Sequence, residues 1–154
     1  MLNGFICYPR DDRRMCTIVR THLAVPERLG QVKFWDDSKI QPGAAWNTDI
    51  ANAIANAHVF LMLISPSFFK PGYIWDIEFP AIEAREANGG TLRIPMKLRP
   101  GFVLPDLGDI QGVPLDAAGR WVPITDFRVR DTGYELAVRQ MLGAIEARFP
   151  RWQP

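Results

Sequence analysis

Long apolar runs are absent from this sequence. A membrane-spanning helix needs roughly 20 consecutive apolar residues, whereas the longest run, "HVFLMLI" at residues 58–64, has the length of a β-strand. Blocks of Lys and Arg are also absent, and 18 basic residues against 17 acidic ones give a net charge of +1. The sequence therefore argues against a membrane protein and against a surface that binds nucleic acid or anionic lipid.

Cysteine and histidine are scarce, with two residues of each. Cys7 lies in an apolar, strand-like run and Cys16 in a helix-like run, and no secretory signal peptide precedes them. We therefore expect two reduced thiols in a cytoplasmic protein. His22 and His58 have no nucleophile motif beside them, and their spacing from the cysteines fits no zinc pattern. Neither a catalytic cysteine nor a metal site is expected.

The glycine-rich turns that bind nucleotide phosphates are missing as well. "YPRDD" follows the first expected strand where a GxGxxG turn would stand, and no GxxxxGK[ST] motif occurs. A nucleotide would have to bind by another route. A phosphate-accepting response regulator, which shares this type of fold, is set aside because the third expected strand ends in "ISP" rather than in Asp.

The patterns that are present predict an α/β protein. The 154 residues suit one domain. The expected strands are residues 2–8, 32–35, 58–64, 91–98 and 120–124, and helices are expected within residues 11–29, 46–57, 73–90 and 134–149. This alternation predicts a doubly wound, mostly parallel five-stranded sheet with helices on both faces. Ligands of such sheets lie outside the carboxyl ends of the strands, here after Tyr8, Trp35 and Ile64.

The stretch "YIWDIEFPAIEAREANGG" (73–90) places an acid, Glu78, among apolar residues and two positions before Pro80. Proline has no amide hydrogen and crowds the carbonyl four residues back, so regular helix is predicted to begin near Asp76 and to hold Glu78 in its first turn. The helix dipole there favours an ionised acid. A catalytic carboxylate and an acid that only stabilises the helix both fit this position.

Three segments together resemble a bacterial TIR (Toll/interleukin receptor) domain. "GFICYPRDD" is similar to the first motif of the family, although Cys7 replaces the usual Ser, a change expected to matter little in a buried strand. "FWDDSKIQPGAAWNTDIANAIANAHVFLMLISPSFF" resembles the second strand, the following loop with its Pro-Gly, the next helix and the central strand. "YIWDIEFPAIEA" resembles the segment that holds the glutamate of the enzymatic members.

The similarity runs from Leu2 to about Phe149, because "RIPMKLRP" and "WVPI" fit the last two strands of the family. It implies that residues 1–154 form a single TIR domain with a flavodoxin-like fold. We expect either this domain alone or the N-terminal part of a longer protein with a fused sensor domain.

For function, the resemblance implies an NAD+ nucleosidase that breaks the bond between nicotinamide and ribose, with Glu78 as the catalytic residue. The products would be nicotinamide and either ADP-ribose or a cyclic isomer. NAD+ would be the substrate, with no further cofactor. Activation would come from self-association of TIR domains into an oligomer or filament during bacterial immune signalling, including antiviral defence. The alternative is a non-enzymatic assembly module that uses the 36–45 loop and the 73–90 helix as contact surfaces.

Candidate substrate contacts follow from the same resemblance. Tyr8, Pro9 and Arg10 leave the first strand where family members contact the nucleotide, and Arg10 is either a phosphate ligand or a solvated surface residue. Trp46 matches an aromatic position that stacks on the substrate, and helix packing suits it equally. Trp75 either lines the pocket or packs in the core; many active members carry Trp one position earlier.

Overall fold

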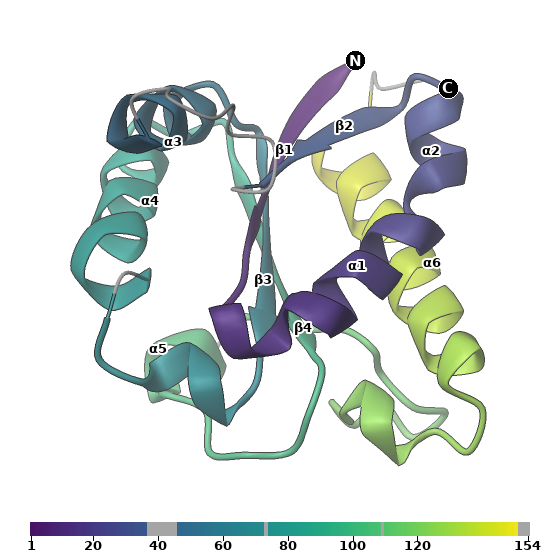
Figure 1. The fold of residues 1–154 in the computed structure, drawn as a ribbon. Helices are drawn as coiled ribbons and strands as arrows, with labels where there is room; N and C mark the ends of the chain where they lie inside the picture. The colour runs from purple at the N-terminus through teal and green to yellow at the C-terminus, as the bar shows by residue number, and fades with distance from the viewer. Residues whose placement is uncertain (37–45, 73, 109, 151–154) are drawn as a thin grey trace.

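The computed structural model describes residues 1–36, 46–72, 74–108 and 110–150. They form a parallel sheet between two layers of helices (Figure 1). The strands are β1 (Leu2–Cys7), β2 (Val32–Trp35), β3 (Val59–Ile64) and β4 (Leu92–Lys97). Their spatial order is β2-β1-β3-β4, and all three pairings are parallel. The predicted doubly wound α/β fold is thus confirmed, and β3, which is buried throughout, lies inside the sheet as its unbroken apolar run indicates.

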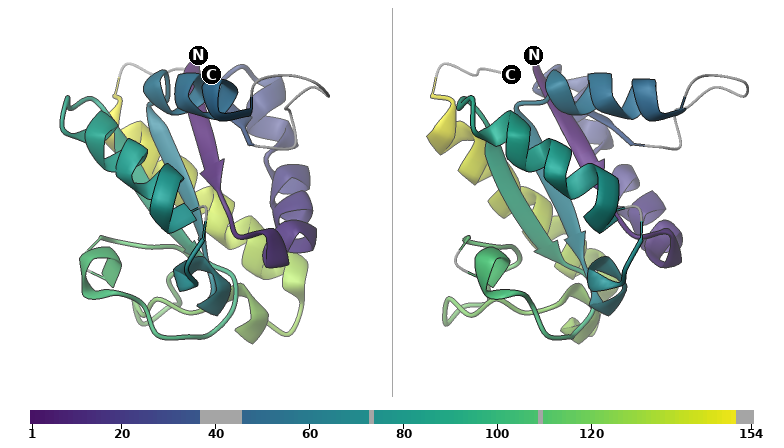
Figure 2. Two further views of the ribbon diagram at one scale, coloured as in Figure 1. Left: turned by 60° about the vertical axis from the view of Figure 1, so that its left-hand side comes forward. Right: turned by 90° about the vertical axis from the view of Figure 1, so that its left-hand side faces the viewer.

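The two faces of the sheet carry different helices, as Figures 1 and 2 show. One layer holds α1 (Arg13–His22), α2 (Ala24–Arg28) and α6 (Arg130–Arg148), and the other holds α3 (Trp46–Ala55), α4 (Phe79–Glu86) and α5 (Pro105–Gly108). None of the described helices is both long and apolar enough to cross a membrane.

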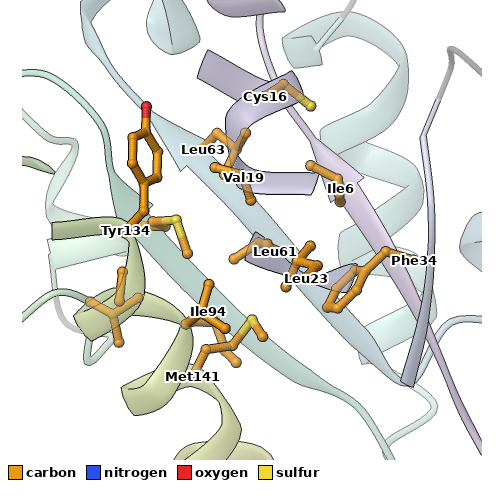
Figure 3. Packing of buried hydrophobic residues seen from close by; sticks show 14 of the residues in the cluster. Ile6, Cys16, Val19, Leu23, Phe34, Leu61, Leu63, Ile94, Tyr134 and Met141 are labelled. Atoms are coloured by element: carbon orange, nitrogen blue, oxygen red, sulfur yellow. The ribbon is translucent and has the colours of Figure 1, made fainter. Parts of the chain in front are cut away.

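Side chains of β1 alternate between the two layers, because successive residues of a strand point to opposite faces. Ile6 and Tyr8 join the core beneath α1 and α6, whereas Phe5 and Cys7 join the core beneath α3 and α4. Figure 3 shows the first of these cores, where strand residues meet side chains from α1 and α6. The end of β1 therefore contributes to both layers at once.

The single helix expected within residues 11–29 is two helices. Pro26 has no amide hydrogen to donate to the carbonyl of His22, and α1 ends at His22. The chain then turns at Leu23, whose side chain is fully buried, and continues as α2.

The expected fifth strand at residues 120–124 is not formed, so this part of the prediction was wrong. Trp121 makes one antiparallel bridge with Leu115. Pro123, which cannot donate to a strand ladder, follows shortly, and the chain enters the 3-10 turn η5 (Ile124–Asp126).

The place beside β4 is taken instead by Val113. Its amide donates to the carbonyl of Pro95 (2.8 Å), and its carbonyl accepts from the amide of Lys97 (2.9 Å). The Gln140 side chain on α6 then holds the backbone of Leu115 through two hydrogen bonds of 2.7 and 3.0 Å. At this edge of the sheet, the bridge of Val113 to β4 therefore takes the place of a full fifth strand.

Candidate functional site

A cavity of about 250 Å³ lies at the carboxyl end of β1. Its wall is formed by the segment that follows β1, the segment that follows β3 and the turn before α4. The lining residues are Tyr8, Pro9, Arg10, Asp11, Ser67, Lys70, Pro71, Gly72, Ile74 and Glu78. Four sequence-predicted residues, Tyr8, Pro9, Arg10 and Glu78, thus surround one space, and their roles toward a ligand stay predictions.

The segment before Pro80 is not regular α-helix. Residues Ile74–Glu78 form a π-helical turn, η4, and α4 begins only at Phe79. The prediction that regular helix begins near Asp76 was therefore wrong. The ring of Pro80 crowds the carbonyl of Asp76, and the wider π turn relieves this crowding before the α-helix starts.

Glu78 lines the cavity and is buried, with only 5% of its surface exposed. Its Oε1 accepts a hydrogen bond of 3.1 Å from the thiol of Cys7, the last residue of β1. Although Glu78 occupies the N-cap position of α4, its side chain makes no capping hydrogen bond to the described residues of that helix, Phe79–Glu86. A negative charge at this position still interacts favourably with the helix dipole, so a catalytic acid and an acid that stabilises α4 both fit the geometry.

An exposed polar cluster lies at the mouth of the cavity. Asp11 Oδ2 accepts from Lys70 Nζ (2.8 Å) and from Ser67 Oγ (3.0 Å). These two hydrogen bonds, the one from Lys70 first, lower the pKa of Asp11 below its usual 3.8. Beside them, Gly72 has a φ of 149°, a backbone conformation that favours glycine, and it turns the chain toward η4.

Sequence reasoning missed Ser67, Lys70 and Gly72. They follow the third strand in "SPSFFKPG", where the rule about the carboxyl ends of parallel strands could have found them.

A second polar group fixes the segments behind the cavity relative to one another. Asp12, only 3% exposed, accepts from Arg99 Nε (2.9 Å) and from Ser65 Oγ. Arg99 also donates to Ser67 Oγ (3.1 Å). These bonds join the carboxyl ends of β1, β3 and β4, so the loops that line the cavity have a common anchor.

The two tryptophans predicted to contact substrate are placed differently. Trp75 is half-buried in an aromatic cluster, with ring centroids 4.6 Å from Phe79, 5.8 Å from Phe69 and 6.0 Å from Phe68. It is not among the residues that line the cavity. Trp46 begins α3, and its side chain lies outside the described part of the structure. The substrate contacts of both residues stay predictions.

The distribution of charge across the cavity suits a ligand with two chemically different ends. Of the charged residues that line the cavity, Glu78 is buried, whereas Arg10 and Lys70 are exposed. A positive charge that develops on a ligand would face the acid, and anionic groups would meet the two cations. Among the described residues, no group of His, Cys, Asp and Glu is arranged to hold a metal ion.

Comparisons with known proteins agree with this architecture. A family model described as the TIR domain matches residues 5–125. The chain is similar to the crystal structure of the TIR domain of the Toll-related receptor TRR-2 from Hydra magnipapillata, with 22% identity and a TM-score of 0.59 over 92% of this chain and 99% of that one.

The chain is also similar to a structure of the RPS4 and RRS1 TIR domain heterodimer, with 14% identity and a TM-score of 0.55 over 92% of this chain and 96% of that one. No curated protein matches the sequence. At these identities the two structures show the fold alone.

Proposed function

The chain belongs to the TIR domain family, and we propose that it cleaves NAD+ between nicotinamide and ribose with Glu78 as the catalytic carboxylate. One observation carries this proposal: Glu78 is buried and lines a cavity together with Tyr8 and Arg10, which follow β1. TIR domains are signalling modules, and the enzymatic step would give this module its chemical output.

The reaction needs little besides a fixed negative charge. The leaving nicotinamide is a pyridinium before cleavage and departs neutral, so no acid has to protonate it. The bonding electrons go to nicotinamide, and the ribose develops oxocarbenium-like positive charge in the transition state. A carboxylate fixed in a site with little water stabilises that charge. Water then attacks and releases a proton to solvent to give ADP-ribose, or a group of the same molecule attacks to give a cyclic isomer.

The exposed cations that line the cavity could bind the diphosphate of the substrate. The diphosphate of NAD+ is anionic, and Arg10 and Lys70 are the cations that line the cavity. Lys70 is paired with Asp11, so a phosphate would compete with this carboxylate for Lys70. No further cofactor takes part in this proposal.

Self-association belongs to the proposal as its activation step. One similar structure is a heterodimer of two TIR domains, and contacts of this kind would let one subunit complete the site of another. The Pro-Gly loop predicted to mediate this contact lies outside the described residues. A cytoplasmic location, a fused sensor domain and a role in bacterial antiviral signalling remain parts of the same proposal.

The second candidate function is a TIR module that only assembles. The same heterodimer structure favours it, and it would use the 36–45 loop and the 73–90 helix as contact surfaces without chemistry. The burial of Glu78 speaks for the enzyme, because an acid that serves a contact surface would be exposed rather than buried beside a cavity.

The deciding experiment incubates concentrated protein with NAD+ and separates the products chromatographically. We expect nicotinamide together with ADP-ribose or a cyclic isomer, and no nicotinamide from Glu78→Gln. Glu83→Gln is the matched control, because Glu83 is an exposed acid on α4, the helix that follows Glu78, and does not line the cavity. Wild-type protein that assembles but leaves NAD+ intact would establish the non-enzymatic alternative.

A further inference from the structure

We propose that Cys7 is a positioning residue for Glu78, whose thiol holds the carboxylate beside the cavity. The kinetic part of this inference rests on the proposed NAD+ cleavage. The contact itself does not, because the 3.1 Å approach of Cys7 Sγ to Glu78 Oε1 is a property of the folded chain.

Cys7 is well placed to fix a partner. It is fully buried and ends β1, where it lies in register with Met62 of the central strand β3. Its side chain points to the layer that contains α4, and Tyr8 and Pro9, which follow it directly, line the cavity. Glu78 approaches from a π-helical turn, 71 residues further along the chain.

A thiol is chemically suited to hold a carboxylate without weakening it. The S–H group is a weak donor, so it orients one carboxylate oxygen while withdrawing little of its negative charge. A hydroxyl at this position would also donate to the carboxylate and orient the same oxygen. Electrostatic catalysis depends on such preorganised charge, and small displacements of the charged group reduce the rate.

The competing interpretation treats Cys7 as a small apolar residue that merely fills the core. The two interpretations predict opposite results when Cys7→Ser and Cys7→Ala are compared. If Cys7 positions Glu78, Cys7→Ser retains a donor and preserves activity, whereas Cys7→Ala removes the donor and loses it. If Cys7 only packs, Cys7→Ala is the milder change because Cys7→Ser buries a hydroxyl.

The kinetic experiment measures kcat and KM for NAD+ in both variants at matched folded fraction. We expect Cys7→Ala to lower kcat on the order of 10-fold with KM nearly unchanged, and Cys7→Ser to keep most of the activity. Cys16→Ala is the control, since Cys16 is also buried but belongs to the opposite core layer. A wild-type kcat in Cys7→Ala, or an equal loss in Cys7→Ser, would overturn the inference.

A spectroscopic experiment tests the contact without turnover. In a Cys16→Ala background, Cys7 is the only thiol, and its S–H stretching band in the infrared spectrum reports the hydrogen bond. We expect a band shifted to low frequency that moves to higher frequency in Glu78→Gln, because a neutral amide is a weaker acceptor. Asp76→Asn, an exposed change in the same turn, should leave the band in place.

The two experiments separate two kinds of failure. A band that responds to Glu78→Gln in a protein that does not cleave NAD+ would refute the proposed function and keep the contact. A band that ignores Glu78→Gln would refute the role of Cys7, whatever the activity.

Discussion

Lys70 Nζ lies 2.8 Å from Asp11 Oδ2, so a cation from the segment after β3 pairs with an anion from the segment after β1 at the mouth of the cavity. Both side chains are largely exposed, and exposed ion pairs contribute little to stability. The main consequence of the pair is therefore electrostatic: Lys70 favours the ionised form of Asp11, while the pair adds little to the stability of the fold.

The first prediction concerns the titration of Asp11. The hydrogen bond from Lys70 is the largest cause that lowers the pKa of Asp11, so Lys70→Gln should raise this pKa toward 3.8. Because the folded-state pKa is the lower one, any stabilisation by the pair is present above the unfolded pKa and is lost as the pH falls through the folded pKa.

This titration can be followed by NMR on the side chain of Asp11. Lys33→Gln, a charge change at an exposed residue of β2, is the control and should leave the pKa where it is. An unchanged Asp11 pKa in Lys70→Gln would show that the pair does not persist in solution.

The second prediction compares activity with stability in Glu78→Gln. Removing the charge should reduce the rate on the order of 10²-fold or more, while the melting temperature stays equal or rises. The physical reason is that a buried carboxylate carries a desolvation cost that a neutral amide largely avoids. Thermal unfolding of Glu78→Gln beside Glu83→Gln measures this. A large fall in the melting temperature would instead assign Glu78 a structural role.

The third prediction addresses Trp75. Its ring packs against Phe68, Phe69 and Phe79, so Trp75→Ala should lower the free energy of unfolding by about 3 kcal/mol, the lower end of the range for buried aromatics, because Trp75 is only half-buried. Activity per folded molecule should stay near the wild-type value. Trp75→Phe is the conservative control and should restore most of the stability. Lost turnover at full stability would support the substrate contact that the sequence resemblance implies.

The sequence predicted well those features that depend on local pattern. The unbroken apolar run at residues 58–64 indicated a covered strand, and β3 is that strand. Glu78 was singled out as an acid within an apolar stretch, and the structure places it among the residues that line the cavity beside the end of β1.

The errors arose where proline or a distant contact decides the structure. The apolar content of residues 120–124 suggested a strand, but Pro123 cannot take part in its ladder. Pro80 opened the preceding turn to π geometry rather than starting a helix near Asp76. The contact of Cys7 with Glu78 was not predicted, because no local pattern reveals a partner 71 residues away; that Cys in place of Ser changes little stays a prediction. The periodicity of apolar residues along the sequence does not reveal which distant side chains contact each other in the fold.

The last prediction is that NAD+ cleavage depends on self-association. The sequence places a Pro-Gly loop beside the cleft, and such a loop can be ordered by a neighbouring subunit so that assembly completes the site. Head-to-tail contacts of this kind are heterologous and can propagate as filaments. Specific activity per molecule should then rise steeply with protein concentration, in step with the particle size measured by light scattering.

The described residues offer a matched pair of variants for this test. Ile77 is 48% exposed on η4, within the 73–90 segment that serves as a contact surface in the non-enzymatic alternative, and Val129 is 58% exposed at the N-cap of α6 in the opposite layer. A buried charge disfavours an interface, so Ile77→Lys should suppress both assembly and turnover at high concentration, whereas Val129→Lys should change neither. Ile77 adjoins Glu78, so Ile77→Lys could lower activity directly. The result supports the assembly mechanism only where the loss of activity accompanies the loss of the large particles. Flat specific activity across a wide dilution series, from protein that stays monomeric throughout, would rule the assembly mechanism out.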